Sequence, residues 1–236
     1  RLLCRFVERR TGVPQIDNCA YRLVMMPRET GKTTIVSQGY TIQSLCRNRD
    51  TSIFLVNEKE DNAKKFLGSI KAEYENNEFL RELFPECIPD DFNKTVWSAT
   101  EIKIKRDTNR KEPSVYVSGV GGAGASMHPD QILIDDMISV AAANNARAGN
   151  REVITTTNQW MHTLEFLLNK NAQPRPDICI IGTHWWYDDC YDHAEEYFGH
   201  KEQPKFYRLK VRLENGDIQA VTVKVVGDLA IFKRSA

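Results

Sequence analysis

The chain has 236 residues, 41% of them hydrophobic and 27% charged, which is typical of a soluble globular protein and excludes a disordered or membrane protein. Its 32 basic and 32 acidic residues cancel, so the net charge gives no reason for constitutive binding to nucleic acid. The six cysteines are widely spread and form no C-x-x-C pair, so we expect free thiols in a reducing cytosol. The sequence shows no signal peptide, and the opening Arg1 is consistent with a piece of a longer protein.

The first third of the chain alternates between apolar runs of strand length and stretches of helix length. Residues 21–26 form a short apolar run stopped by Pro27, which predicts a buried strand, and residues 33–46 predict a helix. A second strand is predicted at 52–57. The segment 58–84 has apolar residues at the i, i+3, i+4, i+7 spacing of a helix face.

The middle of the chain changes character. Short strands are predicted at 95–99, 101–105 and 114–120, and we expect this part to be antiparallel because 101–105 alternates apolar and charged residues. A strand at 131–136 follows, then a long helical segment at 150–168 and a buried strand at 177–183. The last thirty or so residues predict more strands. The alternation of strands and helices favours an α/β fold with a parallel sheet.

The most informative segment lies between the first predicted strand and the helix that follows it, where a phosphate-binding loop must lie. Backbone N–H groups at the helix start favour phosphates, Lys32 can pair with the β and γ phosphates, and the Thr33 hydroxyl can ligate Mg²⁺. Met26 stands where G-x-x-x-x-G-K-S/T would begin, so the usual first glycine is missing. By itself, Gly-Lys-Thr could be a chance tripeptide in a surface turn. The residues expected to bind ATP are Pro27, Arg28, Glu29, Thr30, Gly31, Lys32, Thr33 and Thr34.

Two further elements favour the nucleotide-site interpretation. The apolar run 132–134 ends in Asp135 and Asp136, of which the first would hold Mg²⁺ and the second would orient the attacking water. A solvated turn or a helix cap is the alternative for this acidic pair. Thr183, at the end of another apolar run, could sense the γ-phosphate, or it could belong to a strand-end turn.

Three motifs, PRETGKTT, GVGGAGASMHPDQILIDD and IIGTHWWYDDCYDHAEE, resemble in order and spacing the large terminase subunits of tailed bacteriophages. The resemblance covers about residues 20–200. The family's loop has the form x-R-x-x-G-K-S/T, with an arginine where Arg28 stands and no first glycine. The residues Gly182, Thr183, Trp185, Asp188 and Asp189 are similar to the family's motif that couples hydrolysis to movement.

The resemblance implies a RecA-like P-loop NTPase fold of the ASCE type, with a mainly parallel sheet flanked by helices and an antiparallel addition. It implies an ATPase domain over 1–200, with 201–236 as its C-terminal strands or a linker toward a nuclease domain. The implied activity is hydrolysis of ATP with Mg²⁺ to move double-stranded DNA into a procapsid. The implied partners are DNA, the portal protein, the small terminase subunit and further copies in a ring, although the free protein could be a monomer. The location would be the host cytoplasm and, transiently, the portal, with no membrane and no place in the mature virion.

The resemblance also implies roles for individual residues, and the sequence differs from the family pattern at two places. Arg28 would contact the γ-phosphate or couple its hydrolysis, and Asp136 would take the place of the glutamate that many terminases have. Relatives often carry an arginine finger in the loop before the acidic strand, where this chain has Ala125, Ser126 and Met127. The substitutes that the sequence offers are Arg147 and Arg151.

A helicase-like translocase and a nucleotide-regulated binding module with little hydrolysis remain alternatives. No nuclease is expected, since Glu214 and Asp217 suit a hairpin turn. The basic run 103–111 is a candidate DNA patch, with a solvated hairpin loop as the alternative. Trp160, Trp185 and Trp186 could stack on bases or pack in the core. The five histidines have no metal-ligand spacing among themselves and are expected to be structural or exposed: His128, His162, His184, His193 and His200.

Overall fold

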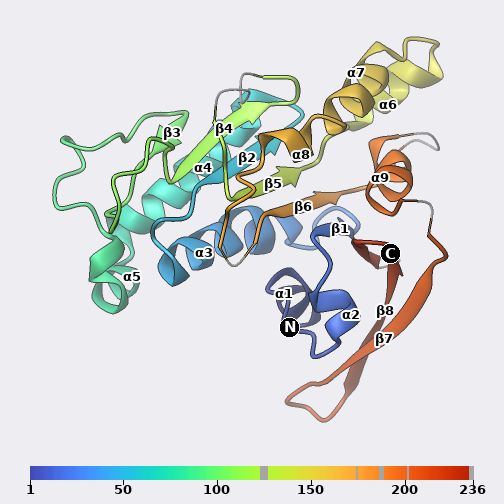
Figure 1. Cartoon of the computed structure of the whole chain (residues 1–236), viewed down its shortest axis with the longest axis horizontal. Coiled ribbons are helices and arrows are strands. Elements are labelled where there is room, and N and C mark those ends of the chain that lie inside the picture. The colour runs from blue at the N-terminus through green and yellow to red at the C-terminus, as the bar shows by residue number, and fades with distance from the viewer. Residues whose placement is uncertain (123–126, 174, 186–188, 201, 234–236) are drawn as a thin grey trace.

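The computed structural model describes residues 1–122, 127–173, 175–185, 189–200 and 202–233, and within them the fold is built on one mixed α/β sheet (Figure 1). The sheet has nine strands in the order β3-β4-β2-β5-β6-β1-β9-β8-β7. The strands are β1 (Tyr21–Met25), β2 (Ile53–Asn57), β3 (Glu101–Ile102), β4 (Val115–Gly119), β5 (Gln131–Asp135), β6 (Asp177–Gly182), β7 (Lys205–Arg212), β8 (Ile218–Val226) and β9 (Leu229–Lys233).

The centre of the sheet is parallel and its margins are antiparallel. Strands β4, β2, β5, β6, β1 and β9 run parallel, whereas β3 pairs antiparallel with β4, and β8 with both β9 and β7. The predicted strands at 21–26, 52–57, 131–136 and 177–183 are all present. The prediction of an antiparallel middle was wrong for 114–120, because β4 is buried on both faces beside β2, as parallel strands usually are.

Helices cover both faces of the sheet, and their apolar sides form two cores. Val24, Leu55 and Leu133 point to the face covered by the helices near the N-terminus, whereas Leu23, Phe54 and Ile132 point to the face covered by α6 to α9. The helices are α1 (Leu2–Val7), α2 (Pro14–Asp17), the π-helix η1 (Thr33–Tyr40), α3 (Thr41–Arg47), α4 (Glu60–Asn76), α5 (Glu78–Leu83), the 3₁₀-helix η2 (Pro85–Cys87), α6 (Val140–Arg147), α7 (Glu152–Met161), α8 (Leu164–Leu167) and α9 (Cys190–Phe198).

Two helical predictions need correction. The helix after Lys32 is present, but its first eight residues are π-helical, a rare geometry that often lies at functional sites. The long helix expected at 150–168 is divided into α7 and α8. Between the two helices, the Thr163 hydroxyl donates to the Trp160 carbonyl at 2.7 Å. This side-chain hydrogen bond uses a carbonyl that a continuous helix would pair with a backbone N–H group, which favours the interruption of the helix.

A buried ion pair ties the amino ends of β1 and β6 together. Arg22, whose side chain is 1% exposed, pairs with Asp177, and Arg9 donates to the same carboxylate at 2.6 Å. Burial alone would raise the pKa of Asp177, but the two guanidinium groups hold that pKa below its usual range. The negative charge of the buried Asp177 is thus compensated by the two arginines.

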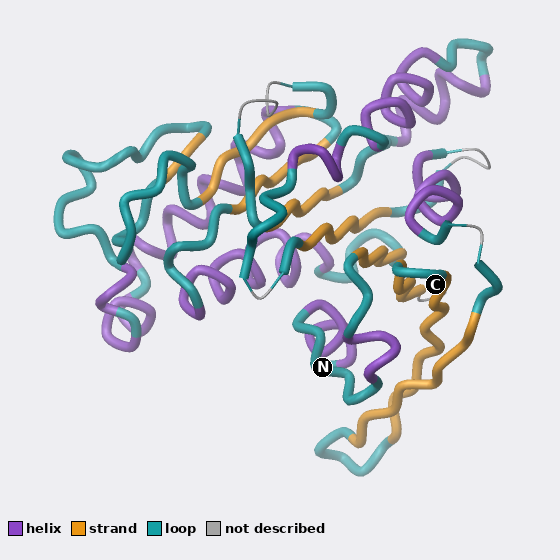
Figure 2. The backbone as a smooth tube through the Cα atoms, in the orientation of Figure 1, coloured by secondary structure: helices purple, strands orange, loops and turns teal. Residues whose placement is uncertain are grey.

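The C-terminal segment belongs to the same sheet, because β9 pairs with β1. Beyond the residues that pair with β9, the β7–β8 hairpin continues as a two-stranded arm, and Figure 2 shows it leaving the body of the sheet. Among the described residues, no helix is both long enough and apolar enough to cross a membrane. All six cysteines are free thiols.

Candidate functional site

The predicted motifs meet at one edge of the sheet, where parallel strands β1, β6 and β5 have their carboxyl ends. The loop 26–32 follows β1, Thr183 follows β6, and Asp136 follows β5. The acidic strand does not lie directly beside the strand that precedes the loop, because β6 is inserted between them. This order brings the three motifs to a common point, with Thr183 in the middle.

Lys32 joins the three motifs. Its Nζ donates to Asp136 Oδ2 at 3.2 Å and to Thr183 Oγ1 at 3.2 Å, and the residue is only 6% exposed. Thr183 Oγ1 in turn donates at 3.0 Å to the carbonyl of Met26, the first residue of the loop. A buried ammonium requires a carboxylate or other acceptors around it, and here two separate strands supply them.

The loop itself has the backbone geometry of a tight turn. Glu29 and Gly31 have φ values of 61° and 74°, and the Thr30 hydroxyl donates back to the Pro27 carbonyl at 2.8 Å. Glycine adopts such a φ without the steric cost that a Cβ adds, whereas Glu29 accepts that cost. Thr34 is exposed at the start of η1.

Arg28 lies over an aromatic ring. Its guanidinium carbon is 4.9 Å from the centre of the Trp185 ring, a cation–π distance. Arg147 Nη2 donates to the Trp185 carbonyl at 3.1 Å, so this segment is held from the side of α6 as well. Arg151 precedes α7, and both arginines have partners within this chain.

Asp135 is buried at the end of β5 and is 1% exposed. Burial raises its pKa to about 6, while hydrogen bonds from Ser37 and Thr33 lower it and the neighbouring Asp136 raises it. The Ser37 hydroxyl, on η1, donates to Oδ2 at 2.7 Å, and Oδ1 has no partner among the described residues. A buried carboxylate with an unused oxygen is costly unless a cation or another donor uses it.

Asp136 has an unusual backbone for a residue that is not glycine, with φ of 51°. Its backbone N–H donates to the Ile181 carbonyl at 2.9 Å and its carbonyl accepts from Glu58 N at 3.0 Å, which fixes the residue between β6 and β2. Its Oδ1 is also without a partner among the described residues. The strain is therefore stored at the residue with the predicted catalytic role.

The donor set fits a hard divalent cation. The Asp135 carboxylate and the Thr33 hydroxyl are oxygen ligands of the kind Mg²⁺ prefers, and the unused Asp135 Oδ1 could occupy a coordination position. The rest of the coordination shell would come from water and phosphate oxygens, as is usual for this ion. Lys32 and the loop N–H groups fit the phosphates of a nucleotide.

The segment after β6 is packed against α9 through a tyrosine. A Cβ on Gly182 would lie 2.1 Å from Tyr191 Oη, so only glycine fits this position. Met137 N, directly after the acidic pair, donates to the same hydroxyl at 3.2 Å. Tyr191 therefore connects α9 with the ends of both β5 and β6.

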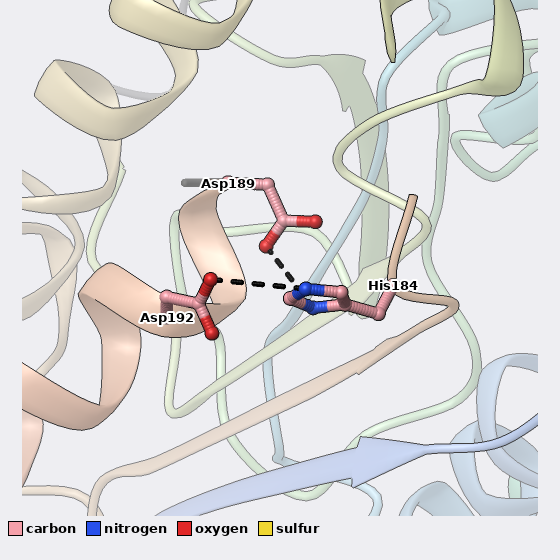
Figure 3. Close-up of side chains that lie close together, drawn as sticks. All are labelled: His184, Asp189 and Asp192. Atoms are coloured by element: carbon pink, nitrogen blue, oxygen red, sulfur yellow. Dashed lines mark ion pairs between the residues drawn. The ribbon is translucent and has the colours of Figure 1, made fainter. Parts of the chain in front are cut away.

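His184 lies between two carboxylates of α9 (Figure 3). Its Nδ1 is 3.6 Å from Asp189 and its Nε2 is 3.8 Å from Asp192. Asp189 caps the helix, as the predicted helix start requires, by accepting from Tyr191 N at 3.0 Å. Burial raises the pKa of Asp189 and His184 opposes that effect. The three side chains offer ligand atoms within 4.8 Å of one another and could hold a cation, although the Asp189 carboxylate already caps α9.

Several residues named from the sequence lie elsewhere or outside the described residues. Ala125, Ser126, Trp186 and Asp188 lie outside them, and Met127 packs partly buried against the core on the α6–α9 face. Trp160 packs against the same core, which favours the packing interpretation.

Sequence reasoning missed Ser37 and Asn57. Ser37 bonds Asp135, and Asn57 Nδ2 donates to the Asp135 carbonyl at 2.5 Å. The signals in the sequence were a serine four residues after Thr33 and an asparagine at the end of a predicted strand. No protein-family model and no curated protein matches the chain.

Proposed function

We propose that the protein is an ATP hydrolase of the P-loop class with a RecA-like fold. The observation that carries the proposal is the position of Lys32, which is buried and donates both to the acidic residue after β5 and to the threonine after β6. A lysine in this place can exchange those two acceptors for phosphate oxygens. The parallel sheet with β6 between β1 and β5 supports the same class.

The chain's own residues can then be given roles. The loop N–H groups and Lys32 would bind the phosphates, while Thr33 and Asp135 would hold Mg²⁺, which neutralises phosphate charge when bound. Asp136 would accept a hydrogen bond from the attacking water, and Thr183 would respond to the γ-phosphate through Lys32 and the Met26 carbonyl. Arg28 would contact the γ-phosphate after leaving the Trp185 ring.

We further propose that hydrolysis serves DNA packaging, as in the terminase large subunits that the three motifs resemble. The partners would then be double-stranded DNA, the portal protein, the small terminase subunit and further copies in a ring. One observation favours a regulated alternative, a module that holds ATP with little hydrolysis until it is assembled: Asp136 Oδ2 is occupied by Lys32. Exchange of that ion pair for phosphate would be the step that assembly accelerates.

The test is phosphate release from ATP·Mg²⁺ by the purified protein, alone and with portal and DNA. Lys32→Ala and Asp136→Asn are each expected to abolish release, and the exposed Lys65→Ala on α4 serves as the matched control. Unaltered turnover in either site variant would refute the assignment. Stimulation by portal and DNA would favour the packaging motor, and activity with neither would leave the binding module as the better explanation.

A further inference from the structure

The β7–β8 arm has a charge composition unlike the rest of the molecule. The two strands contain five basic residues and no acidic residue, in a chain whose net charge is zero. Three of these residues, Arg208, Lys210 and Arg212, lie in the part of the arm that pairs with no third strand. Their charge is therefore concentrated on a narrow projection (Figures 1 and 2).

The arm has two different faces. Leu209 and Val211 are buried and belong to the core shared with α1, which holds the arm against the body of the protein. The alternate residues Arg208, Lys210 and Arg212 are exposed on the opposite face. Successive side chains on one face of a strand are about 7 Å apart, so the three charges form a short, evenly spaced row.

No acidic side chain across the strand pair neutralises this row. The residues directly opposite on β8 are Thr222, Ala220 and Ile218. Within the described residues, none of the three basic side chains takes part in an ion pair. The acidic Glu214 in the turn pairs with Arg1 instead.

The basic run 103–111, which the sequence favours as a DNA patch, differs in this respect. Lys105 pairs with Asp90 at 2.8 Å, and Arg110 pairs with Asp130. Arg106 donates to the Glu112 and Thr51 carbonyls, so its charge holds this loop in place. Lys105 and Arg110 are thus paired with carboxylates and Arg106 binds backbone carbonyls, whereas the three arm residues form no ion pair among the described residues.

We propose that the exposed face of the β7–β8 arm binds the sugar-phosphate backbone of nucleic acid. A row of basic side chains with regular spacing, on two strands that contain no acidic residue, complements a polyanion with regularly spaced charges. The contacts go to phosphates, so they carry no sequence preference. Phe206 is 64% exposed at the start of the same face and adds a surface on which an unpaired base can stack.

This surface gives the proposed DNA-directed function a place of contact, but it does not depend on nucleotide hydrolysis. It lies outside the Lys32 site, and binding can be measured without ATP or Mg²⁺. Failure of the hydrolase proposal and failure of the arm proposal are therefore separate results.

The experiment is fluorescence anisotropy of a labelled duplex and a labelled single strand between 50 and 200 mM salt. The test variant is Arg208→Gln, Lys210→Gln and Arg212→Gln together. The matched control is Lys65→Gln, Lys94→Gln and Lys170→Gln, which removes the same number of exposed charges outside both the arm and the run 103–111. Circular dichroism and the unfolding midpoint check that both variants are folded.

The arm variant is expected to bind the duplex at least about 100-fold more weakly than the wild type at the lowest salt. Its plot of log K against log salt should be shallower by about 2 to 3, since each lost phosphate contact removes about 0.9. The wild-type affinity would then fall about 40-fold more than the variant's across the salt range. The control variant should bind like the wild type, and the ratio of duplex to single-strand affinity identifies the preferred form.

Equal losses in the arm and control variants would overturn the proposal, as would wild-type protein that binds neither nucleic acid. Binding to anionic lipid vesicles without binding to nucleic acid would also overturn it. If the arm variant aggregates while its soluble fraction binds normally, the charges protect the exposed edge of β7 instead.

Discussion

Asp135→Asn is expected to make the protein more stable at neutral pH while it abolishes Mg²⁺-dependent hydrolysis. Burial raises the pKa of this carboxyl from 3.8 to about 6. Since one pKa unit corresponds to about 1.4 kcal/mol, the ionised carboxylate at pH 7.5 costs the folded state about 3 kcal/mol. Asparagine has nearly the same shape, removes the charge and can still accept from Ser37.

The sign of the pH dependence follows from the direction of the shift. The folded state holds the Asp135 proton more tightly than the unfolded chain does. The stabilisation that this provides is complete below about pH 3.8 and is lost as the pH rises through about 6. The advantage of Asp135→Asn over the wild type should therefore be small at pH 4 and grow by roughly 2 to 3 kcal/mol by pH 7.5.

The assay is guanidinium unfolding of both proteins in EDTA at a series of pH values. The difference between the two free energies of unfolding is plotted, because titrations common to both proteins then cancel. About half of the change should fall between pH 5 and 7.5. A difference independent of pH, or a variant less stable than the wild type at neutral pH, would refute the claim that Asp135 is a buried and costly charge.

Two further predictions concern the fold around the site. Asp177→Asn should lower the free energy of unfolding by about 3 to 5 kcal/mol, because it leaves Arg22 buried without its charged partner. Denaturant unfolding measures this change. An effect under about 1 kcal/mol would show that Arg22 is solvated. Gly182→Ala should destabilise by about 1 to 3 kcal/mol through its clash with Tyr191. In a double-mutant cycle, Gly182→Ala should cost much less in a Tyr191→Ala background, and equal costs in both backgrounds would argue against the contact.

The strands that carry the site could be predicted because their signals are local. The apolar runs that become β1, β2, β5 and β6 are short, bounded by turn residues and buried on both faces. The position of the loop between a strand and a helix, and of the acidic pair at a strand end, follows from the same patterns. The type of each element and the residue types at its end were therefore readable in advance.

Strand order and pairing depend on contacts between distant segments, and only the tertiary structure decided them. The insertion of β6 between β1 and β5 brings Thr183 to Lys32, although the two residues are 151 positions apart. The parallel pairing of β4 with β2 also had no local signal, because alternation within one segment does not reveal its partner strand.

The sequence likewise did not show which charged groups form ion pairs. Lys105 and Arg110 have the sequence pattern of a DNA patch, but the fold pairs them with Asp90 and Asp130. The basic residues of β7 remain without acidic partners across the strand pair, because the residues directly opposite them on β8 are uncharged. The sequence by itself determined which residues could bind phosphate, Mg²⁺ or DNA. The tertiary structure decided which of them are buried, paired or exposed, because burial and pairing depend on side chains that come together only when the chain folds.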